Sequence, residues 1–366
     1  MHTVLVLGGY GFFGSRICTT LAQSPSVRLL IGGRDRARGS QAVQKMSLSA
    51  EQFVQVDAND IDLARRLAQM RVDTVINTAG PFQGQSYTVA RAAIEAGCHY
   101  IDLADGRQFV AGIDCLDAIA KEHGVTVVSG ASSVPGLSSA VVDRYLPQFQ
   151  DLRSIHMGIS SGARAPGLAT VRAIFGYLGK PLQRFEGNAW ATTYGWLDLR
   201  QHRFPPPVGS RWLGSCDIPD LELFPRRYPT ARTVTFHAGF ASDLGHLVVW
   251  SLAGCVKAGL LPGALPFAAP LKRLSHWIEP LVSDKGGMFV KLDGVGHAGE
   301  QKSLTWHVVA TSNHGAHIPC GASIALSQKL ASGRSLPHGA MPCMGLLTVA
   351  EYLAPLKGLD IWEVAP

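Results

Sequence analysis

Glycines near the start of the chain have the spacing of a dinucleotide-binding turn. The pattern G-x-G-x-x-G is met by Gly9, Tyr10, Gly11, Phe12, Phe13 and Gly14. In such a turn Gly9 permits the tight bend, Gly11 lets the backbone approach a pyrophosphate, and Gly14 lets the next helix pack closely on the strand. The amide groups at the start of that helix can then bind the phosphates.

The flanking sequence decides between a cofactor site and an ordinary glycine-rich turn. The apolar run Val4–Leu7 precedes the glycines, and a helical stretch to about Ala22 follows them. A strand before the motif and a helix after it form the context in which the motif binds a dinucleotide. We therefore expect a nicotinamide cofactor here.

The end of the second expected strand, 28–31, bears on the choice between NAD and NADP. A carboxylate about 20 positions after the glycines would bind the ribose 2′-hydroxyl of NAD. Here Gly33 and Arg34 stand at that place, and Asp35 follows them. A small residue leaves room for a 2′-phosphate, and Arg34 or Arg36 can pair with it. NADP is favoured over NAD; the alternative is that the arginines merely begin a helix and Asp35 faces the ribose.

Polar residues follow several other expected strands. Asp57 comes after the third strand and could face the adenine. The segment after the fourth strand would pass under the nicotinamide ribose; it comprises Asn77, Thr78, Ala79, Gly80 and Pro81. Ligands of open parallel sheets bind outside the carboxyl ends of the strands, so these residues should line one crevice.

Short apolar runs alternate with amphipathic stretches over the first 130 residues. The runs that we expect to be strands are 4–7, 28–31, 53–57, 74–77, 99–102 and 125–129. This alternation is typical of an α/β fold with a Rossmann doubly wound parallel sheet. Later strand-like runs lie at 154–159, 233–237, 288–292 and 304–311, among aromatic, proline-rich and glycine-rich segments. They predict a mixed or antiparallel second domain.

Longer segments strengthen this assignment by resemblance. The stretches concerned are GGYGFFG at 8–14, INTAGPFQGQSYTVARAAIEAGCHYIDLAD at 76–105, SGASSVPGLSS at 129–139, HIPCGASIALSQKLASG at 317–333 and GAMPCMGLLTVAEYL at 339–353. Together they resemble the saccharopine dehydrogenase-like (saccharopine reductase) family. The resemblance implies an NADP-binding Rossmann domain over 1–134 and 321–366, closed by C-terminal return helices. It also implies an inserted α+β substrate and dimerisation domain over 135–320, and hence a homodimer.

The resemblance implies an oxidoreductase, with hydride transfer to or from a C=N, C=C or C=O bond of a largely apolar small molecule. Such a reaction needs a proton donor. The Tyr-x-x-x-Lys pair, in which the lysine lowers the pKa of the tyrosine, does not occur in the sequence. Tyr177 and Lys180 come nearest, but their spacing is one residue too short. The expected strand ends offer Asp105, Tyr100 and Ser133 as catalytic candidates, although helix capping is the alternative role for such residues. A non-catalytic NADP-binding regulator or scaffold is therefore the second hypothesis.

Other residue types exclude several classes of function. The net charge is +6, but no block of like charges occurs, so nucleic acid is not an expected partner. The seven cysteines form no CxxC pair, which favours a reduced, cytoplasmic location. We expect no signal peptide, because the first expected strand begins by Val4. No metal is expected, because the pair His314 and His317 has no acidic or thiol partner at ligand spacing. Four aromatic residues could form either a substrate wall or core: Trp190, Tyr194, Trp196 and Trp212.

The segment 247–271 is unusually apolar. It is too short and too interrupted by prolines to span a membrane. We expect a buried helix or one at a dimer interface. Trp250, Trp277 and the pair Lys272–Arg273 leave contact with a membrane surface open as an alternative.

Overall fold

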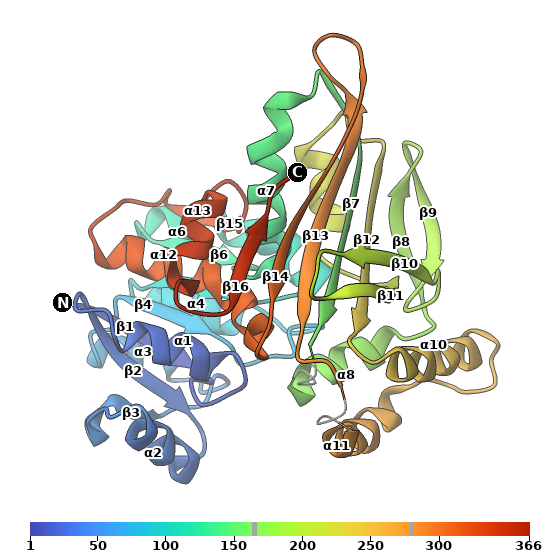
Figure 1. Cartoon of the computed structure of the whole chain (residues 1–366). Helices are drawn as coiled ribbons and strands as arrows, with labels where there is room; N and C mark the ends of the chain where they lie inside the picture. The colour runs from blue at the N-terminus through green and yellow to red at the C-terminus, as the bar shows by residue number, and fades with distance from the viewer. Residues whose placement is uncertain (163–166, 279–281) are drawn as a thin grey trace. The chain divides into compact units, whose positions relative to one another are not determined.

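The computed structural model describes residues 1–162, 167–278 and 282–366. The chain divides into two compact units, each described here by itself. The first unit contains Met1–Ala140 and His317–Leu356, and the second contains Val141–Ala316 and Lys357–Pro366. Figure 1 shows the elements of both units along the chain.

The first unit contains a seven-stranded sheet whose order is β15-β6-β5-β4-β1-β2-β3, with every pairing parallel. Its strands are β1 (His2–Leu7), β2 (Val27–Gly33), β3 (Phe53–Gln55), β4 (Thr74–Asn77), β5 (His99–Asp102), β6 (Thr126–Ser129) and β15 (Gly339–Pro342). The order reverses direction at β1 and β4, as in a doubly wound dinucleotide-binding sheet. The predicted Rossmann sheet is thus confirmed, with one further strand.

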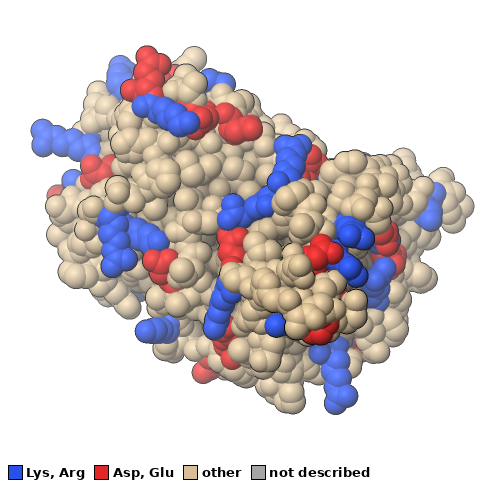
Figure 2. Space-filling model, turned by 90° about the horizontal axis from the view of Figure 1, so that it is seen from above, with Lys and Arg blue, Asp and Glu red and all other residues tan. Residues whose placement is uncertain are grey.

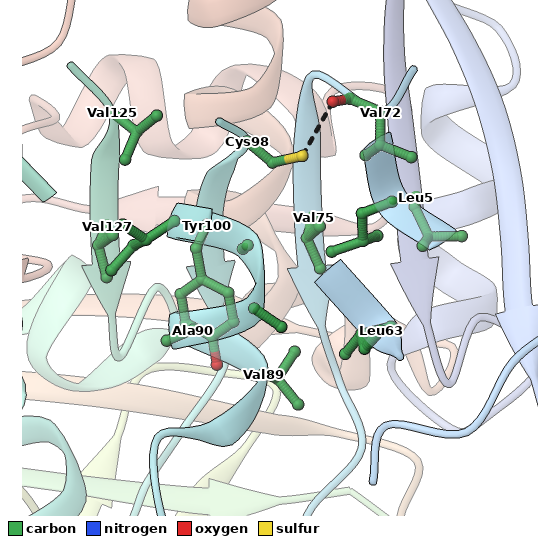
Figure 3. Close-up of a cluster of buried hydrophobic side chains, with 14 of the residues drawn as sticks. Leu5, Leu63, Val72, Val75, Val89, Ala90, Cys98, Tyr100, Val125 and Val127 are labelled. Carbon is green, nitrogen blue, oxygen red and sulfur yellow. Dashed lines mark hydrogen bonds between the residues drawn. The ribbon is translucent and has the colours of Figure 1, made fainter. Parts of the chain in front are cut away.

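Helices cover both faces of this sheet, and successive side chains of β1 therefore lie alternately in two hydrophobic cores. Leu5 and Leu7 belong to one buried cluster, whereas Val4 and Val6 belong to the other. Figure 3 shows the first cluster, in which Tyr100 of β5 lies against Ala90 of α4. The helices of this unit are α1 (Gly14–Leu21), α2 (Arg36–Lys45), α3 (Leu63–Gln69), α4 (Thr88–Glu95), α5 (Arg107–Ala111), α6 (Asp117–Glu122), α12 (Gly321–Ala331) and α13 (Val349–Leu353).

The second unit is built on a nine-stranded mixed sheet. Its main path is β10-β11-β12-β7-β13-β14-β16, and β8 joins β9 to β12. The strands are β7 (Asp151–Ser161), β8 (Pro181–Glu186), β9 (Ala189–Tyr194), β10 (Arg200–Phe204), β11 (Gly209–Ser215), β12 (Thr233–Phe240), β13 (Gly286–Val295), β14 (Gln301–Ala310) and β16 (Ile361–Val364). Among the strands that the structure describes in this sheet, β7 and β12 pair in parallel, and the other neighbours pair antiparallel. The predicted mixed sheet is therefore found.

Helices of the second unit include α8 (Leu168–Tyr177), α9 (Asp220–Arg227), α10 (Asp243–Lys257) and α11 (Ala268–Ile278). The chain enters this unit within α7 (Ser138–Tyr145). Among the described residues, no helix is long and apolar enough to cross a membrane.

The observed boundaries differ from those expected, which were 1–134 with 321–366 and 135–320. The chain leaves the first unit only after Ala140 and returns at His317. The last ten residues, 357–366, belong to the second unit, because β16 pairs with β14. The expected return helices also contain a strand, since β15 pairs with β6 at the sheet edge.

Candidate functional site

In the turn between β1 and α1, the glycine positions have no room for side chains. A Cβ placed on Gly9 would lie 2.9 Å from the carbonyl oxygen of Val6. On Gly14 it would lie only 2.2 Å from the carbonyl oxygen of Gly8. The amide of Gly11 donates to that same Gly8 oxygen at 2.7 Å, which closes the bend. These positions need glycine, as the sequence pattern predicts for a pyrophosphate-binding turn.

The start of α1 is suited to an anion. Its N-cap residue, Phe13, supplies no side-chain hydrogen bond, and no acidic residue occupies the first turn. The positive end of the helix dipole lies here, and the amides of Ser15 and Arg16 donate to the carbonyl oxygens of Gly11 and Phe13. A phosphate is stabilised at the positive end of a helix dipole.

A cavity of about 620 Å³ lies at the carboxyl ends of the neighbouring strands β1, β2 and β4. Its lining includes nine of the residues expected to bind the cofactor: Tyr10, Gly11, Gly33, Arg34, Asp57, Asn77, Thr78, Ala79 and Gly80. The remaining expected residues are not in the lining; they are Gly9, Phe12, Phe13, Gly14, Arg36 and Pro81. Gly9 and Gly14 instead lie where a side chain would prevent the tight bend and the close packing of α1, in agreement with the roles predicted for them.

Tyr10 forms a small stacked arrangement at the β2 end of the cavity. A Cβ on Gly33 would lie 2.2 Å from the Tyr10 ring, so the ring occupies the space that a side chain would need. The Arg38 guanidinium lies 4.9 Å from the centroid of the ring. The Tyr10 hydroxyl accepts a hydrogen bond from the Asp35 amide at 2.9 Å. The ring thereby joins the glycine turn to the start of α2.

Asp35 is used as a helix cap. Its Oδ1 atom accepts a hydrogen bond from the Arg38 amide at 3.0 Å, and it is the N-cap residue of α2. Arg34 and Arg38 both line the cavity, whereas Arg36 does not. Arg38 is thus a further candidate that the sequence did not indicate, while a role for Arg36 stays a prediction. Because α2 begins at Arg36, Arg38 lies in its first turn, close to the end of β2.

The segment after β4 is held in place by its own side chains. Asn77 is buried, and its Oδ1 atom accepts a hydrogen bond from the Ala79 amide at 3.0 Å. The hydroxyl of Thr78 donates to the carbonyl oxygen of Leu7 at 2.8 Å, which ties the segment to β1. Further lining residues that the sequence did not indicate are Leu7, Gly8, Val56, Ala58, Asn59, Gln85, Ser86, Thr88 and Val89.

The three catalytic candidates lie in different surroundings. Asp105 is partly buried and accepts a hydrogen bond from Gln83 Nε2 at 3.0 Å. Tyr100 is fully buried in the core cluster of Figure 3, and its hydroxyl accepts from Asn77 Nδ2 at 3.2 Å. Ser133 is also buried. Tyr100 and Ser133 are thus closed to solvent, and the Ser133 side chain forms a hydrogen bond with Tyr352. Their catalytic roles stay predictions.

Asp102, at the end of β5, is a buried carboxyl group that the sequence did not single out. Its Oδ1 atom accepts hydrogen bonds from the amides of Ala104 and Gly130 and from the Ser129 hydroxyl, at 2.8–3.0 Å. Burial raises the pKa of Asp102 to about 6 in spite of these donors. It joins the ends of β5 and β6 and lies beside Tyr100, whose ionisation it opposes.

Two other expectations concern the second unit. The described residues contain no group of three or more potential metal ligands. His314 instead binds within its own unit, where its Nδ1 atom accepts a hydrogen bond from the Asp360 amide at 2.9 Å. The aromatic residues do not form one wall: Trp196 is buried and stacks on Phe240 at 4.8 Å, whereas Trp190 is 47% exposed.

Comparisons with known proteins agree with this geometry. Residues 4–128 match the family model described as the saccharopine dehydrogenase NADP-binding domain. Comparison with curated proteins gave no match. Among solved structures, apo saccharopine dehydrogenase (L-Glu forming) from Saccharomyces cerevisiae is 14% identical, with a TM-score of 0.69 and coverage of 100% of both chains. At that identity the likeness shows the fold.

Two other solved structures are more distant. The WlbA (WbpB) dehydrogenase from Thermus thermophilus, in complex with NAD and α-ketoglutarate, is 12% identical, with a TM-score of 0.42 and coverage of 100% of this chain and 97% of that chain. A probable dehydrogenase from Thermotoga maritima is 8% identical, with a TM-score of 0.47 and coverage of 97% and 93%. The matched domain and the glycine turn support an oxidoreductase with a nicotinamide cofactor. Residues 4–128 thus match the saccharopine dehydrogenase NADP-binding domain, and the chain shares its fold with the yeast enzyme.

Proposed function

We propose that the protein is an NADP(H)-dependent oxidoreductase. One observation carries the choice of NADP: Arg34 and Arg38 line the cavity at the end of β2, while Asp35 is committed to capping α2. Two guanidinium groups are suited to a 2′-phosphate, and a carboxylate that binds its own helix is poorly placed to bind a ribose hydroxyl.

The rest of the cavity suits the other parts of the cofactor. The turn at Gly11 and the uncapped start of α1 would hold the pyrophosphate. Asp57 and Asn59 would border the adenosine, and the segment from Asn77 to Gly80 the nicotinamide ribose. When bound, the cofactor donates or accepts a hydride; the chain's own residues bind and orient it.

The proposed reaction is reduction, or the reverse oxidation, of a C=N, C=C or C=O bond in a largely apolar small molecule. Asp105 is our proposed proton donor, because among the three candidates it is the one that is partly exposed. Gln83 Nε2 donates to its Oδ1 atom and would orient the carboxyl group. General acid catalysis of this kind contributes roughly 100-fold to 10,000-fold to a rate.

The arginine assignment is tested by titrating NADPH and NADH against three variants. We expect Arg34→Ala and Arg38→Ala each to weaken NADPH binding by roughly tenfold to a hundredfold, because each removes a charge-assisted hydrogen bond. Binding of NADH should change little. Arg36→Ala is the matched control, since Arg36 begins the same helix but does not line the cavity. Equal losses for both cofactors, or an equal loss in the control, would contradict the phosphate assignment.

A non-catalytic NADP-binding regulator or scaffold is the second candidate. It is favoured by the burial of Tyr100 and Ser133, which leaves only one of the three proposed donors accessible. The two functions are separated by following NADPH absorbance with a panel of imines, enones and ketones. Substrate-dependent oxidation that is lost in Asp105→Asn, with NADPH binding intact, supports the enzyme. Tight NADPH binding without turnover on any member of the panel supports the regulator.

A further inference from the structure

Helices α10 and α11 of the second unit, joined through the short turn η5 (Leu265–Phe267), expose an unusual amount of apolar side chain. Nine of the fourteen large exposed hydrophobic residues among the described residues lie between 244 and 277: Leu244, Leu247, Val248, Trp250, Leu260, Leu265, Phe267, Leu274 and Trp277. Trp277 is 80% exposed and Leu244 is 73% exposed. Of the two expectations for 247–271, a fully buried helix does not hold, because α10 buries only part of its side chains, whereas a place at a dimer interface stays a prediction. An exposed apolar surface of this kind indicates a binding partner.

Five of these side chains are connected through grooves that share lining residues: Leu244, Val248, Leu265, Leu274 and Trp277. Leu274 and Trp277 border one shallow groove on α11, together with Ala269. Ala269 also borders a second groove with Leu265. Leu274 in turn shares a third, deeper cavity with Leu244 of α10. We call this set of grooves the α10–α11 surface; the helices lie together at one end of the sheet of their unit in Figure 1.

The deeper cavity has the character of a site for a hydrocarbon chain. It has a volume of about 290 Å³ and lies among α8, α10 and α11. Its apolar lining residues include Val171, Phe175, Phe240, Val249 and Leu271. Its polar lining residues are Ser161, Ser242, Ser275 and Lys272. Because Leu244 and Leu274 are both exposed and part of the lining, an apolar group on the surface could extend into the cavity.

The charges around this surface are basic. Arg273 borders the groove that contains Trp277, and Arg172 of α8 borders the groove that contains Leu265. Neither arginine forms a salt bridge with any residue that the structure describes. From 243 to 278 the sequence has one acidic residue, Asp243, against Lys257, Lys272 and Arg273. Arginines without acidic partners beside exposed tryptophan are typical of surfaces that bind anionic lipid.

We propose that the α10–α11 surface docks on a bilayer that contains anionic phospholipid. Trp277 and Leu274 would enter the boundary between headgroups and acyl chains, while Arg172 and Arg273 would bind the lipid phosphates. A second copy of the chain fits less well. A two-fold interface places the same patch on both sides, so Arg172 and Arg273 would face a segment whose single acidic residue from 243 to 278 is Asp243. The inference is independent of the proposed reaction, because it concerns only the second unit.

The test is sedimentation of the full chain with vesicles of phosphatidylcholine alone or of phosphatidylcholine with a minority of phosphatidylglycerol. We expect binding to the anionic vesicles that falls with added salt. Arg273→Gln should weaken that binding by about fivefold, as expected for one charge near an anionic surface. Its matched control is Arg203→Gln, because Arg203 is also exposed on the second unit but lies outside the α10–α11 surface.

A second pair of variants tests the apolar part. Trp277→Ser should weaken binding, whereas Trp362→Ser should not, since Trp362 is exposed on β16. Equal binding to neutral vesicles would overturn the anionic assignment. Absence of vesicle binding, together with a dimer in sedimentation equilibrium that Trp277→Ser dissociates, would overturn the proposal and assign the surface to a second copy. Thermal unfolding of each variant separates these outcomes from misfolding.

Discussion

At Gly33 a single missing side chain makes space for the Tyr10 ring, which in turn lies under Arg38. The sequence indicated that Gly33 leaves room for a cofactor phosphate. The structure fills part of that room with Tyr10, which no spacing rule reveals because the two residues are 23 positions apart. Arg38 was missed for a related reason: its approach to the strand end depends on where α2 begins.

Gly33→Ala should destabilise the first unit, because the new Cβ overlaps the Tyr10 ring. Overpacking of this kind costs about 1–3 kcal/mol. The free energy of unfolding from urea titration measures the loss. In a Tyr10→Ala background the same substitution should cost much less, since the obstructing ring is gone. An equal loss in both backgrounds would show that Gly33 is required for another reason, such as its backbone conformation.

Because of Asp102, we expect the free energy of unfolding to depend on pH. Its pKa is raised to about 6 by burial, against about 4 in an unfolded chain. Between these values the folded chain holds a proton that the unfolded chain has released, so the contribution to stability is complete below pH 4 and is lost as the pH rises through 6. The unfolding free energy of Asp102→Asn relative to the unsubstituted chain should therefore rise from pH 4 to 6 and then level off. A difference that does not vary over this interval would contradict the assignment.

At the scale of elements, strands with strong apolar runs were predicted to within about two residues, as β4 and β5 show. The strand β15 was missed, because Gly339 and Pro342 make its four residues look like a loop. It forms through contacts distant in sequence: pairing with β6, and a hydrogen bond from the Ala340 amide to Asp117 at 3.1 Å. Local sequence cannot supply such information.

Helix α2 provides the prediction at this scale, since Asp35 caps it with a hydrogen bond from the Arg38 amide. Asp35→Ala should lower stability by about 1 kcal/mol, the usual value of an N-cap, and Asp35→Asn should restore most of it. Neither variant should weaken NADH more than NADPH. The checks are thermal unfolding and fluorescence titration with both cofactors. A selective loss of NADH in Asp35→Ala would instead place this carboxylate on a ribose.

At the scale of the whole chain, only 16% of the residues are charged, and Figure 2 shows large areas without charged groups on the face that it displays. Where those areas gather could not be read from composition. The nine exposed residues between 244 and 277 are ordinary core types by sequence, and only the structure shows them facing solvent. The division into units was foreseen in outline because the strand pattern changes after 130. The return of residues 357–366 to the second unit was not predicted, since the four residues of β16 are too few to indicate which strand they pair with.

The C-terminal segment completes the sheet of the second unit although it follows the first unit in the chain. Glu363 accepts a hydrogen bond from the indole of Trp306 at 2.6 Å, and Trp306 is fully buried. Removal of residues 357–366 should therefore loosen the second sheet, because it uncovers β14 and leaves that indole N–H without Glu363. Hydrogen exchange should speed up in β13 and β14, while β1 and β4 keep their protection and NADPH still binds. Glu363→Gln, which retains an acceptor, should show a smaller effect at the same peptides. If protection fell equally in both sheets, the two units would unfold as one and could not be treated as separate cooperative bodies.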